Sequence, residues 1–190
     1  MRLERSPKME AKQGELVLTT ARMSVRPIRS SDLDALHALW TIPAVRRYLW
    51  DDQVFSKSEV AAIIDLSSAS FEGRGYGFFA LELKESADLI GFCGYRLNPD
   101  DVGQIELLYG IHPNHWGEGL VAEAARAVLR HGFETCQMER VVAATDTPNQ
   151  QAVRVLQKLG MVFEARRQFH GLDTVFYCMT RDDFASIYDD

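Results

Sequence analysis

The most informative stretch of this chain reads Ile105-Glu-Leu-Leu-Tyr-Gly-Ile-His-Pro-Asn-His-Trp-Gly-Glu-Gly-Leu-Val-Ala-Glu-Ala-Ala125. The pattern predicts a strand that ends near Ile111, a tight loop that holds Gly117 and Gly119, and a helix directly after the loop. The two glycines let the backbone come close to a ligand, because no Cβ stands in the way. The free N–H groups and the positive dipole end at such a helix start suit a diphosphate. A bare Gly-x-Gly is also typical of a tight structural turn, so this pattern alone leaves both interpretations open.

The sequence before this stretch alternates between extended and helical patterns. Residues 16–28 carry spaced apolar side chains and are predicted to be extended. The predicted helices are an apolar stripe from Leu33 to Trp40, a short piece from Pro43 to Leu49, and a helix that begins with a capping box of Ser56 and Glu59. The predicted strands of an antiparallel meander are Tyr76–Leu83, Leu89–Leu97 and Gly103–Ile111. This half of the chain is therefore expected to be α+β.

The sequence after this stretch predicts a strand–helix–strand–helix unit that a hairpin closes. The predicted elements are an amphipathic helix Gly117–Glu134, a buried strand Arg140–Thr145, a helix that begins at Pro148 with Thr147 as its cap, and a hairpin of Val162–Phe169 and Thr174–Thr180. The tail is expected to hold one helical turn. The whole order indicates one domain over residues 16–190, preceded by a flexible N-terminal arm over residues 1–15.

Composition and charge exclude several classes of protein. The chain has 190 residues, of which 46% are hydrophobic and 25% charged, as in an ordinary globular domain. Its net charge of −6 disfavours a nucleic-acid partner, which usually meets a basic surface. No run approaches the ~20 apolar residues that span a bilayer, and no secretory signal is recognisable, so no membrane role is expected. The widely spaced Cys93, Cys136 and Cys178 indicate reduced thiols and hence a cytoplasmic protein.

Three motifs resemble those of the GCN5-related N-acetyltransferases, the GNAT family. The loop Asn114-His-Trp-Gly-Glu-Gly119 is similar to the family's pyrophosphate loop, Gln/Arg-x-x-Gly-x-Gly/Ala, which binds acetyl-CoA. The segment from Asn149 to Met161 resembles the family's motif Asn-x-x-Ala/Ser-x-x-x-x-x-Lys-x-Gly-Phe. The front, from Leu18 to Ile28, is similar to the branch that acetylates the N-termini of ribosomal proteins. The likeness covers residues 16–180, and the three motifs stand in the family's order.

The resemblance implies a single GNAT-like domain of class α+β, in which helices flank a central mixed, mostly antiparallel sheet. It implies acetyl-CoA as co-substrate. No metal is expected, because His112 and His115 have the spacing of metal ligands but no third ligand is identifiable nearby. Asn149 is expected to bind the pantetheine arm or to reach the thiol through water; capping of a helix is the alternative interpretation. The cofactor-binding residues that the resemblance implies are Tyr109, Gly110, Ile111, Trp116, Gly117, Glu118, Gly119, Leu120, Val121, Asn149 and Arg154.

Acetyl transfer needs a proton acceptor for the amine and favours a proton donor for the departing thiolate. Glu106, on the strand before the loop, resembles the strand glutamate with which family members accept the amine proton, often through water. A paired structural carboxylate is its alternative interpretation. The usual proton donors are absent, because Leu156 stands where many members have Tyr, and Ala152 where this branch often has Ser. Glu106 and Asn149 are the catalytic candidates, and backbone N–H groups at the end of the strand are expected to polarise the carbonyl.

An acceptor site is predicted after the short helix in the front segment. Trp50 offers an aromatic wall, and Asp51 and Asp52 would attract a cationic amine. An α-amino group, with a pKa of about 7.7–8.0, needs less base assistance than lysine at about 10.4, so a sparse acid–base set favours a protein or peptide N-terminus. The alternatives are a small amine, such as an amino acid, polyamine or aminoglycoside, and a catalytically weak acyl-CoA-binding module. The expected assembly is a monomer or a homodimer.

Overall fold

The computed structural model describes residues 16–49, 52–101 and 103–188, so the predicted arm over residues 1–15 lies outside the described residues. The helices are α1 (Leu33–Thr41), α2 (Pro43–Arg46), α3 (Lys57–Arg74), α4 (Leu120–Arg130), α5 (Gln150–Lys158) and α6 (Arg181–Tyr188). The strands are β1 (Leu18–Thr19), β2 (Met23–Pro27), β3 (Phe78–Leu83), β4 (Leu89–Leu97), β5 (Ile105–Ile111), β6 (Arg140–Asp146), β7 (Val162–Phe169) and β8 (Leu172–Thr180). Short 3₁₀ turns are η1 (Ser30–Asp32) and η3 (Pro113–His115), and η4 (His131–Thr135) is π-helical.

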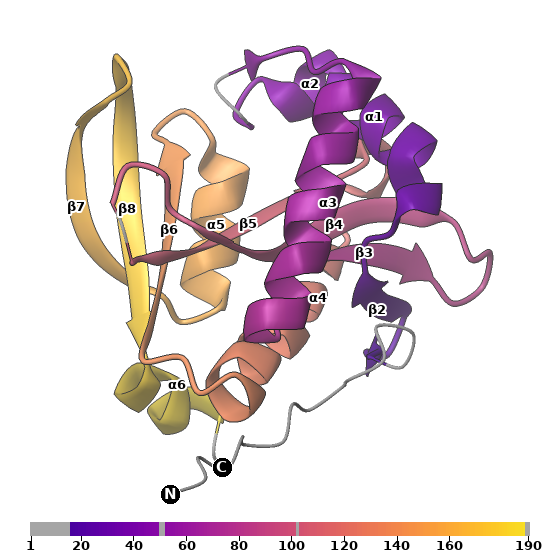
Figure 1. Ribbon diagram of the computed structural model, residues 1–190. Coiled ribbons are helices and arrows are strands. Elements are labelled where there is room, and N and C mark those ends of the chain that lie inside the picture. The colour runs from indigo at the N-terminus through magenta and orange to yellow at the C-terminus, as the bar shows by residue number, and fades with distance from the viewer. Residues whose placement is uncertain (1–15, 50–51, 102, 189–190) are drawn as a thin grey trace, which may run out of the picture.

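The eight strands form one sheet in the order β1-β2-β3-β4-β5-β6-β8-β7. Strands β5 and β6 are parallel, and every other neighbouring pair is antiparallel. The parallel pair follows from α4, because a helix that crosses over the sheet returns the chain in the same direction. The predicted meander is β3, β4 and β5. The structure thus confirms a single α+β domain with a mixed, mostly antiparallel sheet between helices (Figure 1).

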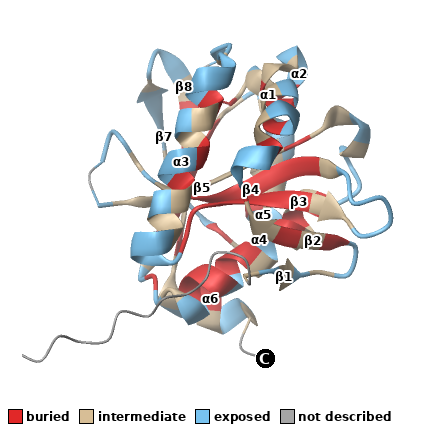
Figure 2. Cartoon of the chain, turned by 45° about the vertical axis from the view of Figure 1, so that its right-hand side comes forward, coloured by how far each residue is buried: buried red, intermediate tan, exposed pale blue. Residues whose placement is uncertain are grey.

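Helices cover the two faces of the sheet, and two apolar clusters fill the layers between. The alternating residues of β3 divide between them, with Phe79 and Leu81 in one cluster and Phe78 and Ala80 in the other. The first cluster holds the buried sides of α4, α5 and α6, and the second holds those of α1 and α3. Buried residues accordingly follow the strands and the inner sides of the helices (Figure 2). No helix in the described ranges is long and apolar enough to cross a membrane.

Helix α3 begins with the predicted capping box. The Ser56 hydroxyl oxygen accepts a hydrogen bond from the Glu59 backbone N–H at 3.3 Å, and the Glu59 carboxylate accepts one from the Ser56 backbone N–H at 2.7 Å. Each side chain thus satisfies one backbone donor that the helix itself leaves without a partner.

The variant Ser56→Ala is expected to lower the free energy of unfolding by ~1 kcal/mol, because the cap is lost. Urea denaturation followed by circular dichroism measures this change. Ser70→Ala, inside the same helix, is the matched control, and it is expected to be neutral or slightly stabilising because alanine is the best helix former. Equal destabilisation by both variants would contradict a role of the cap.

Helix α4 is shorter than predicted. We expected a helix from Gly117 to Glu134, but α4 covers Leu120–Arg130. It begins later because Gly117 and Gly119 have φ values of +81° and +79°, which a right-handed helix does not contain. It ends earlier because Cys136 N–H donates to the His131 carbonyl at 3.0 Å, a five-residue step that makes the following turn a π-helix.

Helix α5 also begins later than predicted, at Gln150 instead of Pro148. Asn149 is its N-cap, because its side-chain oxygen accepts from the Ala152 N–H at 3.3 Å. Thr147, the predicted cap, donates its hydroxyl to Asp173 instead, at 2.9 Å. Other boundaries moved as well: residues 16–28 form two strands, the second helix stops at Arg46, β5 starts at Ile105, β8 starts at Leu172, and the tail forms the eight-residue α6.

Candidate active site

The parallel strands β5 and β6 diverge, and a cleft opens beyond the point where they meet. Their pairing register is defined only at Glu106 and Val142, near the start of each strand, within the part of the chain that the structure describes. Two cavities of about 600 Å³ and 580 Å³ lie in this region. Both are lined by Tyr48, Leu49, Tyr109, Asn149 and Ala152. The two cavities are therefore the two ends of one cleft between β5 and α5.

One end of the cleft, which we call the loop end, is the smaller cavity beside the glycine loop and the start of α4. The structure gathers there ten of the eleven predicted cofactor-binding residues: Tyr109, Gly110, Ile111, Trp116, Gly117, Gly119, Leu120, Val121, Asn149 and Arg154. Glu118 is the predicted residue that does not line it. Lys158, one helical turn from Arg154, also lines the loop end. These residues come from β5, the loop, the start of α4 and the region of α5, so the β–loop–α unit and α5 build this end together.

The two glycines of the loop are required by their backbone conformation, and they leave room for a ligand. Both have a positive φ, which residues with a Cβ rarely adopt. A Cβ at Gly117 would meet no atom within 4 Å, and one at Gly119 would meet only Arg22 Nη2, at 3.9 Å. Gly119 is the N-cap of α4 and has no side chain to bond the first N–H groups of the helix. The loop end thus has the space and the donors that an anionic group needs.

Side chains of the loop hold its shape. Trp116 Nε1–H donates to the Ile111 carbonyl at 3.0 Å, and the Asn114 N–H donates to His112 Nδ1 at 3.3 Å. His115 Nδ1 lies 3.7 Å from Glu118 Oε2. The two histidines therefore serve the loop itself, and no cluster of three or more metal-ligating side chains is found among the residues with described positions.

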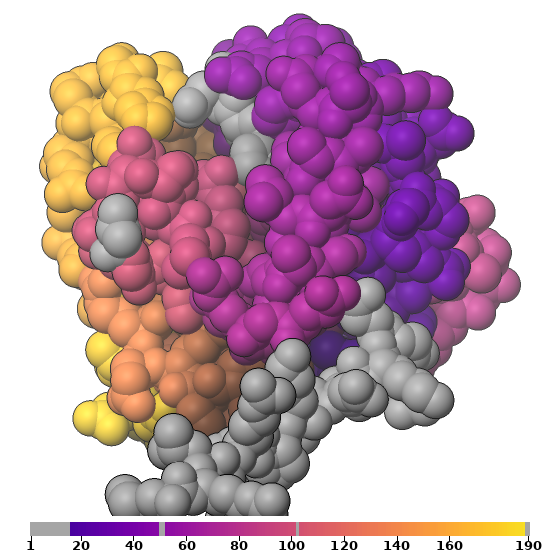
Figure 3. Space-filling view, in the orientation of Figure 1, coloured from indigo at the N-terminus to yellow at the C-terminus, as the bar shows by residue number. Residues whose placement is uncertain are grey.

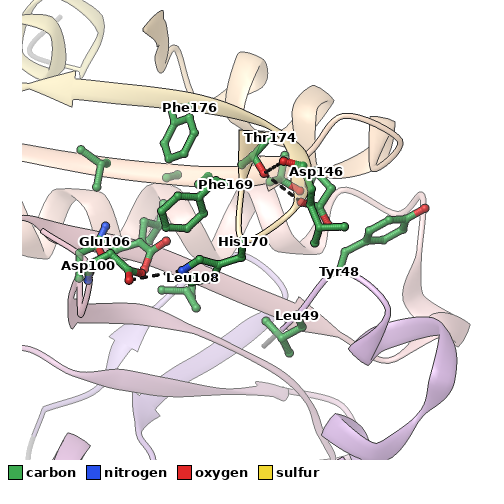
Figure 4. Close-up of a pocket in the computed structure, with 18 of the residues that line it drawn as sticks. Tyr48, Leu49, Asp100, Glu106, Leu108, Asp146, Phe169, His170, Thr174 and Phe176 are labelled. Carbon is green, nitrogen blue, oxygen red and sulfur yellow. Dashed lines mark hydrogen bonds and ion pairs between the residues drawn. The ribbon is translucent and has the colours of Figure 1, made fainter. Parts of the chain in front are cut away.

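The other end of the cleft, which we call the carboxylate end, is the larger cavity and contains Glu106. This residue is 8% exposed, and Arg96 Nε–H donates to its Oε2 at 2.8 Å. Glu106 and Leu108 lie on the floor of the cavity, beneath Phe169 and Phe176 of the β7–β8 hairpin (Figure 4). The structure thus shows both predicted features of Glu106, a carboxylate that lines a cavity and one that is paired. The ion pair with Arg96 does not exclude the Glu106 carboxylate from the cavity.

Contacts between distant segments form the walls of the carboxylate end. His170 Nε2 at the β7–β8 turn lies 3.4 Å from Asp100 Oδ1 of the β4–β5 connection. Thr174 donates its hydroxyl to Asp146 at 3.3 Å, at the end of β6 (Figure 4). In the space-filling view the β4–β5 connection (rose) lies beside the yellow hairpin (Figure 3). Sequence reasoning missed these wall residues, because no local pattern brings segments 70 positions apart together.

Tyr109 and Asn149 lie where the two ends meet. The Tyr109 hydroxyl donates to the Ala152 carbonyl of α5 at 3.2 Å, and burial raises the pKa of Tyr109 well above its usual range, so this group stays a neutral donor. Asn149 caps α5, and its amide also donates to Thr145 Oγ1 at 3.0 Å. Leu156 is 1% exposed and brings no hydroxyl. The capping interpretation of Asn149 therefore holds, while the residue still lines both ends.

The predicted acceptor residues are only partly placed. Trp50 and Asp51 lie outside the described residues. The Asp52 carboxylate pairs with Arg46 Nη1 at 2.9 Å, and its side chain is 58% exposed. Asp52 does not line either end of the cleft, whereas its neighbours Leu49 and Gln53 line the carboxylate end. The front segment thus contributes to this cavity, and the role of Asp51 and Asp52 in acceptor binding stays a prediction.

Known proteins resemble this chain along most of its length. The family model described as an acetyltransferase (GNAT) domain matches residues 22–162. An uncharacterized N-acetyltransferase, p20, of Bacillus licheniformis is 28% identical over 75% of this chain and 80% of its own length. Spermidine N(1)-acetyltransferase of Escherichia coli K12 is 23% identical over 75% of this chain and 74% of its own length. The solved structure of the ribosomal L7/L12 alpha-N-protein acetyltransferase RimL in complex with coenzyme A has a TM-score of 0.74, at 17% identity, over 88% of this chain and 99% of that one.

Proposed function

The chain belongs to the GNAT family of acetyltransferases, and from this premise we propose that it transfers an acetyl group from acetyl-CoA directly to a primary amine. The preferred acceptor in this proposal is the α-amino group of a protein or peptide N-terminus. The observation that supports it is one cleft with two chemically different ends, a glycine loop at a helix start and a buried carboxylate at Glu106. The proposed enzyme works in the cytoplasm, as a monomer or homodimer.

The loop end fits the diphosphate of acetyl-CoA. The first N–H groups of α4 donate to it, and the absence of a Cβ at Gly117 and Gly119 lets it approach them. Arg154 and Lys158 add positive charge on α5. The pantetheine arm then passes Asn149 and Tyr109 toward the carboxylate end. When bound, acetyl-CoA supplies the activated acyl group as a thioester.

The carboxylate end fits the acceptor amine. The amine nitrogen forms a bond to the thioester carbon, the carbon–sulfur bond breaks, and the nitrogen passes its proton to Glu106 directly or through water. Arg96 holds the carboxylate in place. Backbone N–H groups at the end of β5 stabilise the developing oxyanion. Ala152 and Leu156 carry no hydroxyl that could protonate the departing thiolate. Orientation of the two substrates by one rigid sheet supplies much of the rate.

The double variant Asp51→Asn/Asp52→Asn is expected to raise the acceptor's KM several-fold at low ionic strength and to leave the KM of acetyl-CoA unchanged. The two carboxylates raise the local concentration of a cationic acceptor, and salt screens this attraction. Initial rates at low and high salt measure both effects. Asp65→Asn, at an exposed position of α3, is the control. Equal acceptor kinetics of variant and wild type at low salt would remove the aspartates from the acceptor site.

Initial rates of CoA thiol release over a panel of amines test the acceptor class. The panel contains lysine-free peptides with a free N-terminus, N-terminally blocked peptides with one lysine, and polyamines. We expect the highest kcat/KM for the free N-termini. A higher value for polyamines would favour a small-amine acetyltransferase, in line with the similarity to a spermidine acetyltransferase. Saturable binding of acetyl-CoA without turnover of any amine would favour a binding module.

A further inference from the structure

A side chain far from the glycine loop in sequence is hydrogen-bonded both to the loop and to the helix that follows it. Arg22 lies in the turn between β1 and β2, about a hundred residues before the loop, yet its Nη1–H donates to the Glu118 carbonyl at 3.1 Å. Its Nε–H donates to Glu123 Oε2 at 2.8 Å, and its backbone N–H donates to Glu123 Oε1 at 2.9 Å. One arginine thus joins the loop to the first turn of α4. We call this set of contacts, made by Arg22, Glu118 and Glu123, the arginine clasp.

The clasp fixes the orientation of one peptide group in the loop. In a trans peptide the carbonyl and the following N–H point in opposite directions. Since the Glu118 carbonyl points at Arg22, the Gly119 N–H points away from it. This peptide joins Glu118 to Gly119, so it turns through ψ of Glu118 and φ of Gly119, and at the glycine this rotation meets little steric resistance. Without the clasp, this peptide would therefore be free to turn.

The arginine clasp also balances a negative charge at the start of α4. Glu123 places a carboxylate in the first turn of α4, where it would repel a phosphate. Burial alone would raise the pKa of Glu123, but hydrogen bonds from Thr20 and from Arg22 outweigh it and lower the pKa, so the group is ionised at neutral pH. Arg22 Nη2 lies 2.7 Å from Glu123 Oε2 and balances this charge. The same Nη2 is the nearest atom to the Cβ position of Gly119, at 3.9 Å.

The turn that carries Arg22 is itself anchored. The Lys84 N–H donates to the Arg22 carbonyl at 3.1 Å, and the Thr20 N–H donates to the Met23 carbonyl at 3.0 Å. The Arg22 side chain is half exposed, whereas that of Glu123 is 19% exposed. The arginine therefore reaches the loop from a sheet edge with a defined position.

We infer that Arg22 is a positioning residue that holds the glycine loop in the conformation that receives the diphosphate of acetyl-CoA. The inference rests on the proposed function and adds to it a residue outside the glycine motif. It assigns no direct chemistry to Arg22. The effect of Arg22 should consequently fall on donors that carry a diphosphate and spare those that lack one.

The variants Arg22→Gln and Arg22→Lys test this inference in the full chain. Arg22→Gln is expected to raise the Kd of acetyl-CoA about tenfold, equal to about 1.4 kcal/mol, by titration calorimetry. The kcat/KM for S-acetylpantetheine, a donor without the diphosphate, is expected to stay at the wild-type value. Arg22→Lys keeps the charge but not the planar fork of donors, so its Kd for acetyl-CoA should lie between those of the wild type and Arg22→Gln. Arg130→Gln, which removes the Arg130–Glu134 pair at the other end of α4, is the matched control and should bind acetyl-CoA as wild type does.

Each outcome of these experiments supports or overturns the positioning role of Arg22. Unchanged affinity of Arg22→Gln, or an equal loss with both donors, overturns the positioning role. Wild-type affinity of Arg22→Lys shows that charge alone acts and overturns it as well. If Arg22→Gln does not fold, Arg22→Lys gives the test through the same two donors. If the wild-type protein binds no acetyl-CoA, the proposed function itself is overturned. If the wild type binds acetyl-CoA and Arg22→Gln binds it equally well, only the positioning role is overturned.

Discussion

Replacement of Glu106 by glutamine is expected to lower kcat about a hundredfold, at the lower end of what a positioned acid or base contributes, with little change in the KM of acetyl-CoA. Glutamine keeps the size of the side chain and still accepts a hydrogen bond from Arg96, but it does not take a proton from the amine. Because the lost interaction occurs only in the transition state, kcat falls and binding does not.

Glu164→Gln is the matched control for this experiment. Glu164 lines the same end of the cleft and is also paired with an arginine, Arg140, but it lies on β7 and is more exposed. A loss that came only from removing negative charge in the cavity would appear in both variants. Full activity of Glu106→Gln would remove Glu106 from the mechanism and leave water as the proton acceptor.

Replacement of Gly119 by valine is expected to raise the Kd of acetyl-CoA at least tenfold, or about 1.4 kcal/mol, measured by titration calorimetry. The φ of +79° disfavours a β-branched residue strongly, so the loop changes its conformation. The valine side chain would also add bulk at a position that lines the loop end, where a Cβ meets only Arg22 Nη2, at 3.9 Å. Both effects act on the surface that receives the diphosphate.

Gly75→Val separates the ligand effect from backbone strain. Gly75 has the same φ of +79°, and a Cβ there would meet only Cys136 Sγ at an ordinary 3.6 Å, but Gly75 ends α3 and does not line the cleft. We expect it to lower the melting temperature and to leave the Kd unchanged. Equal affinity of wild type and Gly119→Val would show that the loop is a structural turn only.

The glycine loop and the sheet around it could be predicted because their signals are local. Periodicity placed the strand before the loop and the helix after it, and the capping box of Ser56 and Glu59 located the start of α3. The start of α4 was misplaced because periodicity does not reveal the positive φ of Gly117 and Gly119. Likewise, Pro148 suits a first helical turn, but Asn149 is the better cap, and the side-chain bond to Ala152 decides the boundary.

The carboxylate end could be predicted only in part, because its parts come from distant segments. Arg96 could have been paired with Glu106 from the register of the β4–β5 hairpin, in which the two residues stand directly opposite each other. The contact between Asp100 and His170 had no such signal, since it depends on how the closing hairpin meets the β4–β5 connection. Arg22 was missed for the same reason. It lies in the three-residue connection between β1 and β2, where nothing in the local sequence indicates a contact about a hundred positions away.

We propose that this cleft joins acetyl-CoA to the α-amino group of a peptide N-terminus, and a single rate measurement can refute this proposal. It is the initial rate of CoA thiol release from acetyl-CoA in the presence of a lysine-free peptide, compared with the same peptide acetylated at its N-terminus. We predict release that depends on the free peptide and saturates with its concentration, and only background release with the blocked peptide. Equal thiol release with both peptides, or no release with either, would refute transfer to a peptide N-terminus.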